Sequence, residues 1–315
     1  MPGKPGGERS FGMLKYAVKR ILLAVLTVLI IAAITFFAMN AIPGGPFASE
    51  KAKDPATMAM LEKRFGLDKP LGEQFVNYIK NLLHGDLGIS TKTNREISDI
   101  ITESFGVSAR LGLMAAGIAV VFGLVLGCIA ALNRGKWLDR IIIFFTTLLV
   151  SVPNFVLATI LLLIFCLQLK WIGVWNPANP NYILPVIALA MNPMAYITRL
   201  TKSSMLDVLG QDYIRTARAK GVRGSLVIFK HALRNGLIPV ITYVGPMTAY
   251  ILTGSMVVET VFTIGGLGTQ FVKSIGNQDY PLIMATTIFL AVLMVMATLI
   301  SDLVYKLVDP RITLE

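Results

Sequence analysis

The sequence predicts an all-α integral membrane protein with six transmembrane helices. Of the 315 residues, 55% are hydrophobic and 15% are charged, and the mean hydropathy is +0.68. So few charged residues cannot cover the surface of soluble domains, which indicates that lipid surrounds much of the chain. A helix needs about 20 apolar residues to cross a hydrocarbon core about 30 Å thick. Six runs meet or approach this length: 21–39, 107–131, 141–168, 182–200, 237–262 and 282–305.

Two of these runs allow a second interpretation. The first, 21–39, is too long for the core of a signal peptide and only weak cleavage signals follow it, so we expect a retained helix. The third, 141–168, contains Pro153 but is too short for two crossings and a turn, which favours one kinked or tilted helix. The first twelve residues of the tail 1–20 are rich in glycine, proline and charge, and we assign them no function.

The distribution of basic residues predicts the orientation of the helices. Six crossings place both ends of the chain on one side of the membrane. Eighteen of the 29 basic residues lie on that side, in or next to the tail 1–20, the loop after the second run, the loop 201–236 and the tail 307–315. The opposite side has ten, and eight of these fall in the loop 40–106, where nine acidic residues offset them. Because basic loops remain cytoplasmic, both ends are predicted to be cytoplasmic.

The loop 40–106 is long enough to form a small extracytoplasmic unit. One helix is expected to start near Pro55 and run toward Phe65, and a second is expected over 72–83. The second helix has one apolar face, formed by Phe75, Tyr78, Ile79, Leu82 and Leu83. Such a stripe more often packs on the rest of the protein than binds a ligand. Residues 107–306 then form the core, with the other five transmembrane helices.

The sequence contains no recognisable catalytic, metal or cofactor motif. Neither GxxxxGK[ST] nor GxGxxG occurs, so the chain is not expected to hydrolyse ATP itself. His84 and His231 fall on opposite sides of the membrane in the predicted topology, which excludes a metal site that both share. Cys128 and Cys166 lie inside apolar runs, which excludes a disulfide scaffold. The net charge of +11 follows from the cytoplasmic loops, and no nucleic-acid partner is expected.

Acidic residues near the membrane are few. Glu259 falls toward the outer end of the fifth run, and Asp302 toward the inner end of the sixth. A carboxylate at bilayer depth costs roughly 2.5–3.5 kcal/mol, so it normally faces water, a partner or the bundle interior. For Glu259, a role in lining a transport pathway and simple placement at the interface are equally supported. Ser255 is the other pathway candidate.

The loop 201–236 contains a patterned segment. Ser204 and Asp207 fit a capping box that starts one short helix. Asp212 can cap a second helix over 213–220, which Gly221 can end by adopting a left-handed conformation. Composition alone favours an amphipathic helix that lies against anionic lipid headgroups.

The order of residues in this loop closely resembles the cytoplasmic EAA loop of ABC-type importer permeases. The matching stretches read DYIRTARAKG at 212–221 and FKHALRN at 229–235, followed by Pro239. Arg215, Thr216 and Ala217 stand where the general pattern has Glu-Ala-Ala, but YIRTARAKG is typical of the peptide-transporter branch.

Further stretches look like the B-type permease of the oligopeptide, dipeptide and nickel import family. They read MLKY at 13–16, AIPGGPF at 41–47, GDLGIS at 85–90 and GSMVVETVF at 254–262. Relatives often carry proline where this chain has Gly265. Together the matches extend over nearly the whole chain from Met13 onward.

The resemblance implies a non-catalytic permease subunit of an ATP-driven importer in a bacterial-type inner membrane, with peptides as cargo. It also implies a second, related permease, two cytoplasmic ATPase subunits that use ATP and Mg, and an extracytoplasmic binding protein. The loop 201–236 would supply a coupling helix that docks in the ATPase. The docking residues expected on this basis are Asp212, Tyr213, Arg215, Thr216, Ala217, Arg218, Ala219, Lys220 and Gly221.

Three alternatives remain. An importer of nickel or another small solute belongs to the same family, and the scarcity of histidine weakly disfavours direct metal handling. A stand-alone secondary carrier would transport in liposomes without an ATPase. A membrane scaffold would show no substrate-dependent response in its partners.

Overall fold

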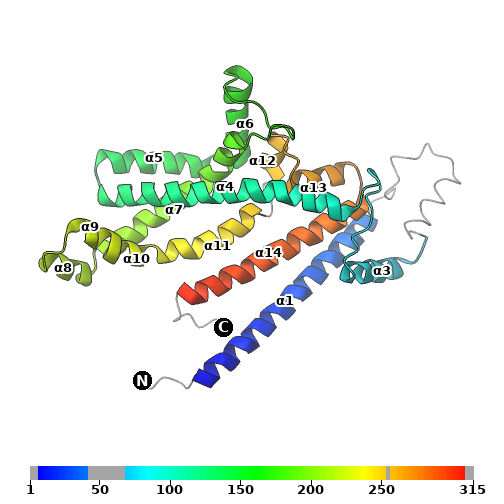
Figure 1. The fold of residues 1–315 in the computed structure, drawn as a ribbon, viewed down its shortest axis with the longest axis horizontal. Helices are drawn as coiled ribbons and strands as arrows, with labels where there is room; N and C mark the ends of the chain where they lie inside the picture. Colours follow the sequence, from blue (N-terminus) through cyan, green and yellow to red (C-terminus); the bar gives the residue numbers. More distant parts are fainter. Residues whose placement is uncertain (1–5, 42–67, 253–255, 309–315) are drawn as a thin grey trace. The chain divides into compact units, whose positions relative to one another are not determined.

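The computed structural model describes residues 6–41, 68–252 and 256–308, which are predominantly helical (Figure 1). Apart from isolated bridges between Ile89 and Glu96 and between Asn176 and Asn179, these residues form no β structure, so the all-α prediction is confirmed for them. The helix predicted between Pro55 and Phe65 lies outside the described residues. The helices are α1 (Gly6–Asn40), α3 (Leu71–Leu83), α4 (Ile97–Leu132), α5 (Trp137–Ser151), α6 (Asn154–Leu161), η2 (Leu162–Gln168), α7 (Ile183–Leu209), α8 (Asp212–Ala219), α9 (Gly224–Leu226), η3 (Val227–Ala232), α10 (Leu233–Gly236), α11 (Ile238–Leu252), α12 (Met256–Val261), α13 (Leu267–Gly276) and α14 (Tyr280–Val308).

Five stretches of helix within the described residues are long and apolar enough to cross a membrane. They are Val18–Asn40, Ile97–Leu132, Ile183–Leu209, Ile238–Val261 and Tyr280–Ile300.

The third predicted run contains a sharp break. Its two halves, Trp137–Ser151 and Asn154–Gln168, meet at a bend of 102°. Pro153 lies at the break, and the residue before it, Val152, is extended, as steric contact with a proline ring requires. A bend is therefore present at Pro153, but it separates two helices, and the prediction that they form one kinked or tilted crossing stays a prediction. Among the residues that the structure describes, there is a sixth candidate span only if this bent pair counts as one crossing.

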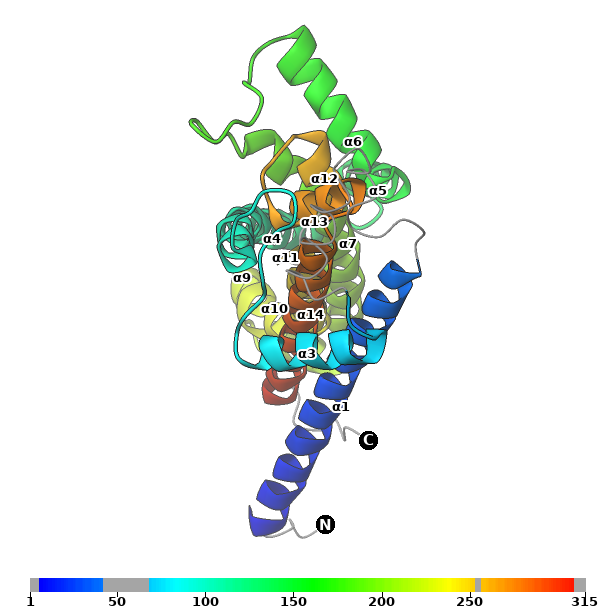
Figure 2. The same cartoon turned by 90° about the vertical axis from the view of Figure 1, so that its right-hand side faces the viewer.

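The chain divides into two compact units, which are described separately. The first contains residues 1–103 and 270–295. In its apolar core α1 packs against α14, and α3 lies on both (Figure 2). The face of α3 meets this core as predicted, except that Leu83 is 82% exposed. The buried residues of this core are Ala32, Phe36, Met39, Tyr280, Ile283, Met284 and Ile288.

A buried carboxylate in the first unit joins the loop before α4 to the start of α14. Asp279 is 2% exposed and accepts a hydrogen bond of 2.5 Å from the hydroxyl of Ser90. It also accepts bonds of 3.1 Å from the backbone N–H and the hydroxyl of Thr91. Ser90, the last residue of the stretch 85–90, and Thr91 after it are thus tied by hydrogen bonds to a distant part of the sequence.

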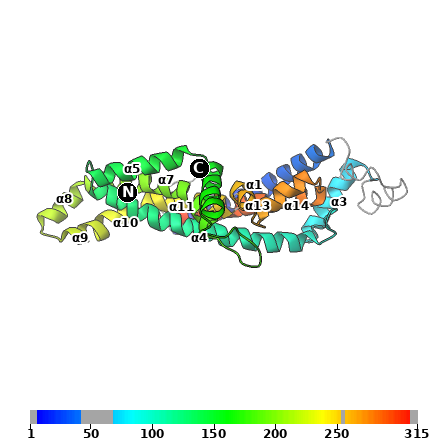
Figure 3. The same cartoon turned by 90° about the horizontal axis from the view of Figure 1, so that it is seen from above.

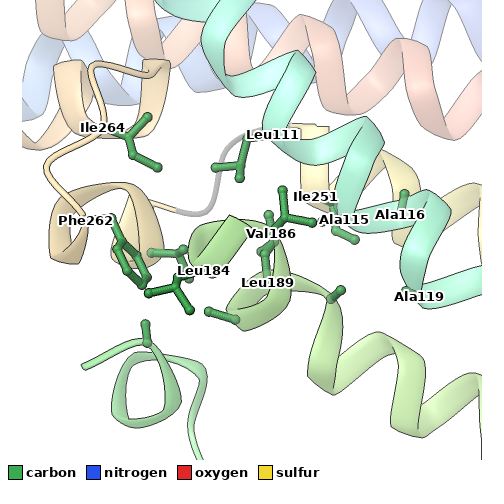
Figure 4. Packing of buried hydrophobic residues seen from close by; sticks show 14 of the residues in the cluster. Leu111, Ala115, Ala116, Ala119, Leu184, Val186, Leu189, Ile251, Phe262 and Ile264 are labelled. Carbon is green, nitrogen blue, oxygen red and sulfur yellow. The ribbon is translucent and has the colours of Figure 1, made fainter. Parts of the chain in front are cut away.

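The second unit contains residues 104–269 and 296–315, and its core lies where α4, α7, α11 and α12 meet (Figure 4). α5 runs alongside α7 (Figures 1 and 3). α4 approaches α7 closely because two glycines four residues apart face it. A Cβ on Gly123 would lie 2.7 Å from the side chain of Ile197, and one on Gly127 would lie 2.5 Å from that of Thr201.

Candidate functional site

The loop expected to dock the ATPase begins later in the chain than predicted. α7 continues without a break to Leu209, so Ser204 lies inside this helix and does not cap a new one. Ser204 is 9% exposed and Met205 is fully buried. The prediction of a capping box at Ser204 was wrong because Met205 packs into an apolar cluster with Ile214 and Val227, and this packing favours continuation of the helix.

The helix expected to dock the ATPase corresponds to α8. Its N-cap is Gln211, in an extended conformation, and no side chain caps the helix. Asp212 is the first residue of α8 and not its cap, which corrects the prediction by one position. At this place the carboxylate still stabilises the helix, because the N-terminus of a helix carries partial positive charge.

The C-terminal end of α8 has the hydrogen-bond pattern of a Schellman motif. The N–H of Gly221 donates to the carbonyl of Arg218 (3.0 Å), and the N–H of Val222 donates to the carbonyl of Ala217 (3.2 Å). Gly221 has φ +72°, the left-handed conformation that this motif requires and that glycine adopts without a steric penalty. The prediction that Gly221 ends the helix is confirmed.

One face of α8 anchors it to the second unit. Ile214 is fully buried in an apolar cluster with Ala131, Met205, Val227 and Ala232. Ala217 and Val222 are half-buried and pack against the same cluster. Ala217, expected to be open to a partner, therefore lies against the chain's own core.

The other expected docking residues are exposed in this chain. They are Asp212, Tyr213, Arg215, Thr216, Arg218, Ala219, Lys220 and Gly221. Polar contacts hold few of them: Asn235 donates to the hydroxyl of Tyr213 (2.9 Å), and Arg215 lies 3.7 Å from Asp212. The Arg215–Asp212 pair contributes little, since its side chains are 75% and 96% exposed. α8 thus presents an exposed basic surface within the described part of its unit.

Of the two residues expected near the transport pathway, Ser255 and Glu259, the structure describes one. Ser255 lies outside the described residues. Glu259, on α12, is fully buried within the second unit. One of its carboxylate oxygens accepts a hydrogen bond from the hydroxyl of Ser108 (2.7 Å), and the other accepts from the backbone N–H of Thr269 (3.2 Å). The Ser108 hydroxyl in turn accepts from the backbone N–H of Leu267 (2.8 Å).

Glycines close the space around this carboxylate. A Cβ on Gly266 would clash with Glu259 and would lie 2.6 Å from the hydroxyl of Ser108. A Cβ on Gly268 would lie 3.0 Å from the Glu259 carboxylate and 2.8 Å from the backbone of Met256. We call Glu259, Ser108, Gly266 and Gly268 the glutamate cradle. Sequence analysis missed Ser108, which is 151 residues away, although the glycines that follow an isolated acid were a usable signal.

Within the described residues no group of three or more His, Cys, Asp or Glu side chains could hold a metal ion. His84 lies in the first unit, where its ring is 2.7 Å from the carbonyl of Lys80, and His231 lies in η3 of the second unit.

The arrangement is that of a multi-pass helical membrane protein with an exposed helix in its longest basic loop. Residues 123–314 match the model of the family described as "Binding-protein-dependent transport system inner membrane component". Residues 13–112 match the corresponding N-terminal model. The chain belongs to this family of ABC importer permeases, as its EAA-like loop predicted, and it is a permease subunit.

Proteins similar in sequence cover nearly the whole chain. It is 46% identical to the dipeptide transport system permease protein DppB of Bacillus subtilis, over 96% of this chain and 99% of that protein. It is 43% identical to the oligopeptide transport system permease protein OppB of Haemophilus influenzae, over 95% and 99%. A crystal structure of an amino acid ABC transporter with histidines shares the fold, with 16% identity and a TM-score of 0.54 over 66% of this chain and 94% of that chain.

A second solved structure has the same fold. The MetNI methionine ABC transporter in inward-facing conformations is 16% identical, with a TM-score of 0.53 over 67% of this chain and 96% of that chain.

Proposed function

We propose that this chain forms the translocation pathway of a peptide importer, together with a second, homologous permease. Peptide cargo is supported by near full-length relatives named as dipeptide and oligopeptide permeases, at 40–46% identity. An extracytoplasmic binding protein delivers the peptide, and two cytoplasmic ATPase subunits supply energy from ATP and Mg. Both termini are cytoplasmic in this arrangement, and residues 107–306 form the permease core.

The proposal assigns α8 to the ATPase interface. The single observation that carries this assignment is that α8 is fixed by Ile214 and its C-terminal cap while its basic face stays exposed. A helix attached along one face can transmit a movement of its partner to α7, because Ile214 and Met205 pack in the same cluster. Exposed small and basic residues leave room for a partner to approach closely.

The test uses a bulky side chain at Ala219, which is exposed, in place of the half-buried Ala217. In the assembled importer, Ala219→Trp should lower ATP-dependent peptide uptake at least about tenfold and reduce the ATPase that co-purifies, because loss of about 1.4 kcal/mol of binding is a tenfold effect. Ser225→Trp is the matched control, since Ser225 is exposed in the same loop but lies outside α8. Normal uptake and normal co-purification with Ala219→Trp would contradict the assignment.

A further inference from the structure

Two neighbouring membrane helices, α7 and α11, carry polar and aromatic residues at helical spacing. On α7, Asn192, Tyr196 and Arg199 are four and three residues apart and share one face. On α11, Tyr243, Pro246 and Tyr250 follow the mirrored spacing of three and four. We call these six residues the tyrosine face.

Contact between two aromatic rings joins the residues of α7 and those of α11 into one surface. The rings of Tyr196 and Tyr243 are 4.3 Å apart between centroids, at an interplanar angle of 34°. Tyr196 remains 47% exposed and Tyr250 is 69% exposed. Both helices belong to the second unit and pack against each other, so the surface is continuous.

The composition of the tyrosine face does not suit lipid. Phenol hydroxyls and a side-chain amide are polar groups, and on a membrane helix such groups normally face water, a partner or a polar pathway. Pro246 adds an acceptor, because its ring nitrogen cannot donate to the backbone carbonyl of Thr242 one turn earlier.

An exposed face of α5 in the same unit is mostly apolar. On α5 the exposed residues Ile141, Phe144, Phe145 and Leu148 have helical spacing and apolar side chains, and Thr147 beside them is the exposed polar residue nearest to Phe144. The tyrosine face is richer in polar groups than this face, which favours a neighbour other than hydrocarbon.

We propose that the tyrosine face contacts the peptide during its passage and sets the tolerance of the pathway for different side chains. This inference rests on the proposed function. A tyrosine ring offers a large rigid apolar surface, and its hydroxyl both donates and accepts hydrogen bonds. Such groups fit a ligand in which amide groups repeat while the side chains vary. Arg199, at one end of the face, adds a positive charge that attracts a peptide carboxylate.

The experiment measures uptake of a radiolabelled tripeptide by the complete importer in proteoliposomes. Tyr250→Ala should raise the KM for the peptide about fivefold, as loss of an aromatic contact of about 1 kcal/mol predicts, and Tyr196→Ala should have a similar effect. Tyr250→Phe should raise it only about twofold, because the ring is retained. Phe144→Ala is the matched control on the apolar face and should leave uptake unchanged.

A second measurement does not depend on the stability of the alanine variants. Replacement of Tyr250 by the photoreactive p-benzoylphenylalanine should crosslink this chain to the labelled tripeptide during ATP-driven turnover, whereas the same replacement of Phe144 should not. Crosslinks from position 250 to lipid or to the second permease alone would overturn the inference. So would an unchanged KM in the alanine variants while the wild-type importer takes up the peptide. Absence of peptide uptake by the wild-type importer would instead overturn the proposed function, and this inference with it.

Discussion

α8 and the glutamate cradle both contain polar residues that the sequence analysis singled out, but the two regions differ in how far these residues are buried and hydrogen-bonded. On α8 the charged side chains are exposed. The ion pair between Arg215 and Asp212 is 3.7 Å long, and both of its side chains are exposed to solvent. In the cradle, Glu259 is fully buried, and its two oxygens accept hydrogen bonds from the hydroxyl of Ser108 and from the backbone N–H of Thr269.

This difference separates two uses of polar residues in a membrane protein. A buried carboxylate is tolerated only when donors surround it, so its removal disturbs the fold. An exposed basic face costs the isolated chain little, so it remains available to a partner that binds and releases. We therefore expect substitutions in the cradle to act on stability and substitutions on α8 to act on assembly.

The largest effect is expected from Glu259→Ala. The change leaves the Ser108 hydroxyl and at least one backbone N–H without an acceptor in a closed space, at about 1–3 kcal/mol for each group. The apparent melting temperature of the purified chain should fall by several degrees. Glu259→Gln is the control. Its melting temperature should lie between those of the wild type and Glu259→Ala, since one amide oxygen remains as an acceptor. A stable Glu259→Ala protein would show that the cradle is not a structural tie.

A smaller effect is expected from Gly221→Ala. No atom lies within 4 Å of a Cβ added at Gly221 or at Gly224, so any difference between the two alanine variants comes from the backbone. Of these two glycines, Gly221 alone has a positive φ, and alanine there destabilises the fold by about 1 kcal/mol or more. Hydrogen exchange of the α8 amides should accelerate about fivefold in Gly221→Ala.

Gly224→Ala is the matched control for this measurement and should exchange like the wild type. Equal exchange rates in the two variants would contradict the role assigned to the left-handed residue at the end of α8.

The smallest effect on stability is expected from Tyr213→Phe. This change removes only the hydroxyl that accepts from Asn235, an exposed bond worth about 0.5 kcal/mol. The melting temperature should be nearly unchanged, and Asn235→Ala should match it because it removes the other half of the same bond. A loss as large as that of Glu259→Ala would erase the distinction between the two regions.

The sequence alone determined the features that depend on local composition. Long apolar runs predicted membrane helices because a bilayer demands length and hydrophobicity, whatever the rest of the chain does. Pro153 predicted the kink and Gly221 the end of α8, because each acts on the backbone at its own position. The apolar face of α3 was also predicted, since helical periodicity defines it.

Tertiary structure decided the features that depend on distant partners. Ser204 looked like the start of a helix, but the burial of Met205 keeps α7 continuous to Leu209. Ala217 looked available for docking until packing placed it on the cluster around Ile214. Glu259 accepts a hydrogen bond from Ser108, which is 151 residues away in the sequence. No local pattern encodes such contacts, because their energy exists only after the helices have packed together.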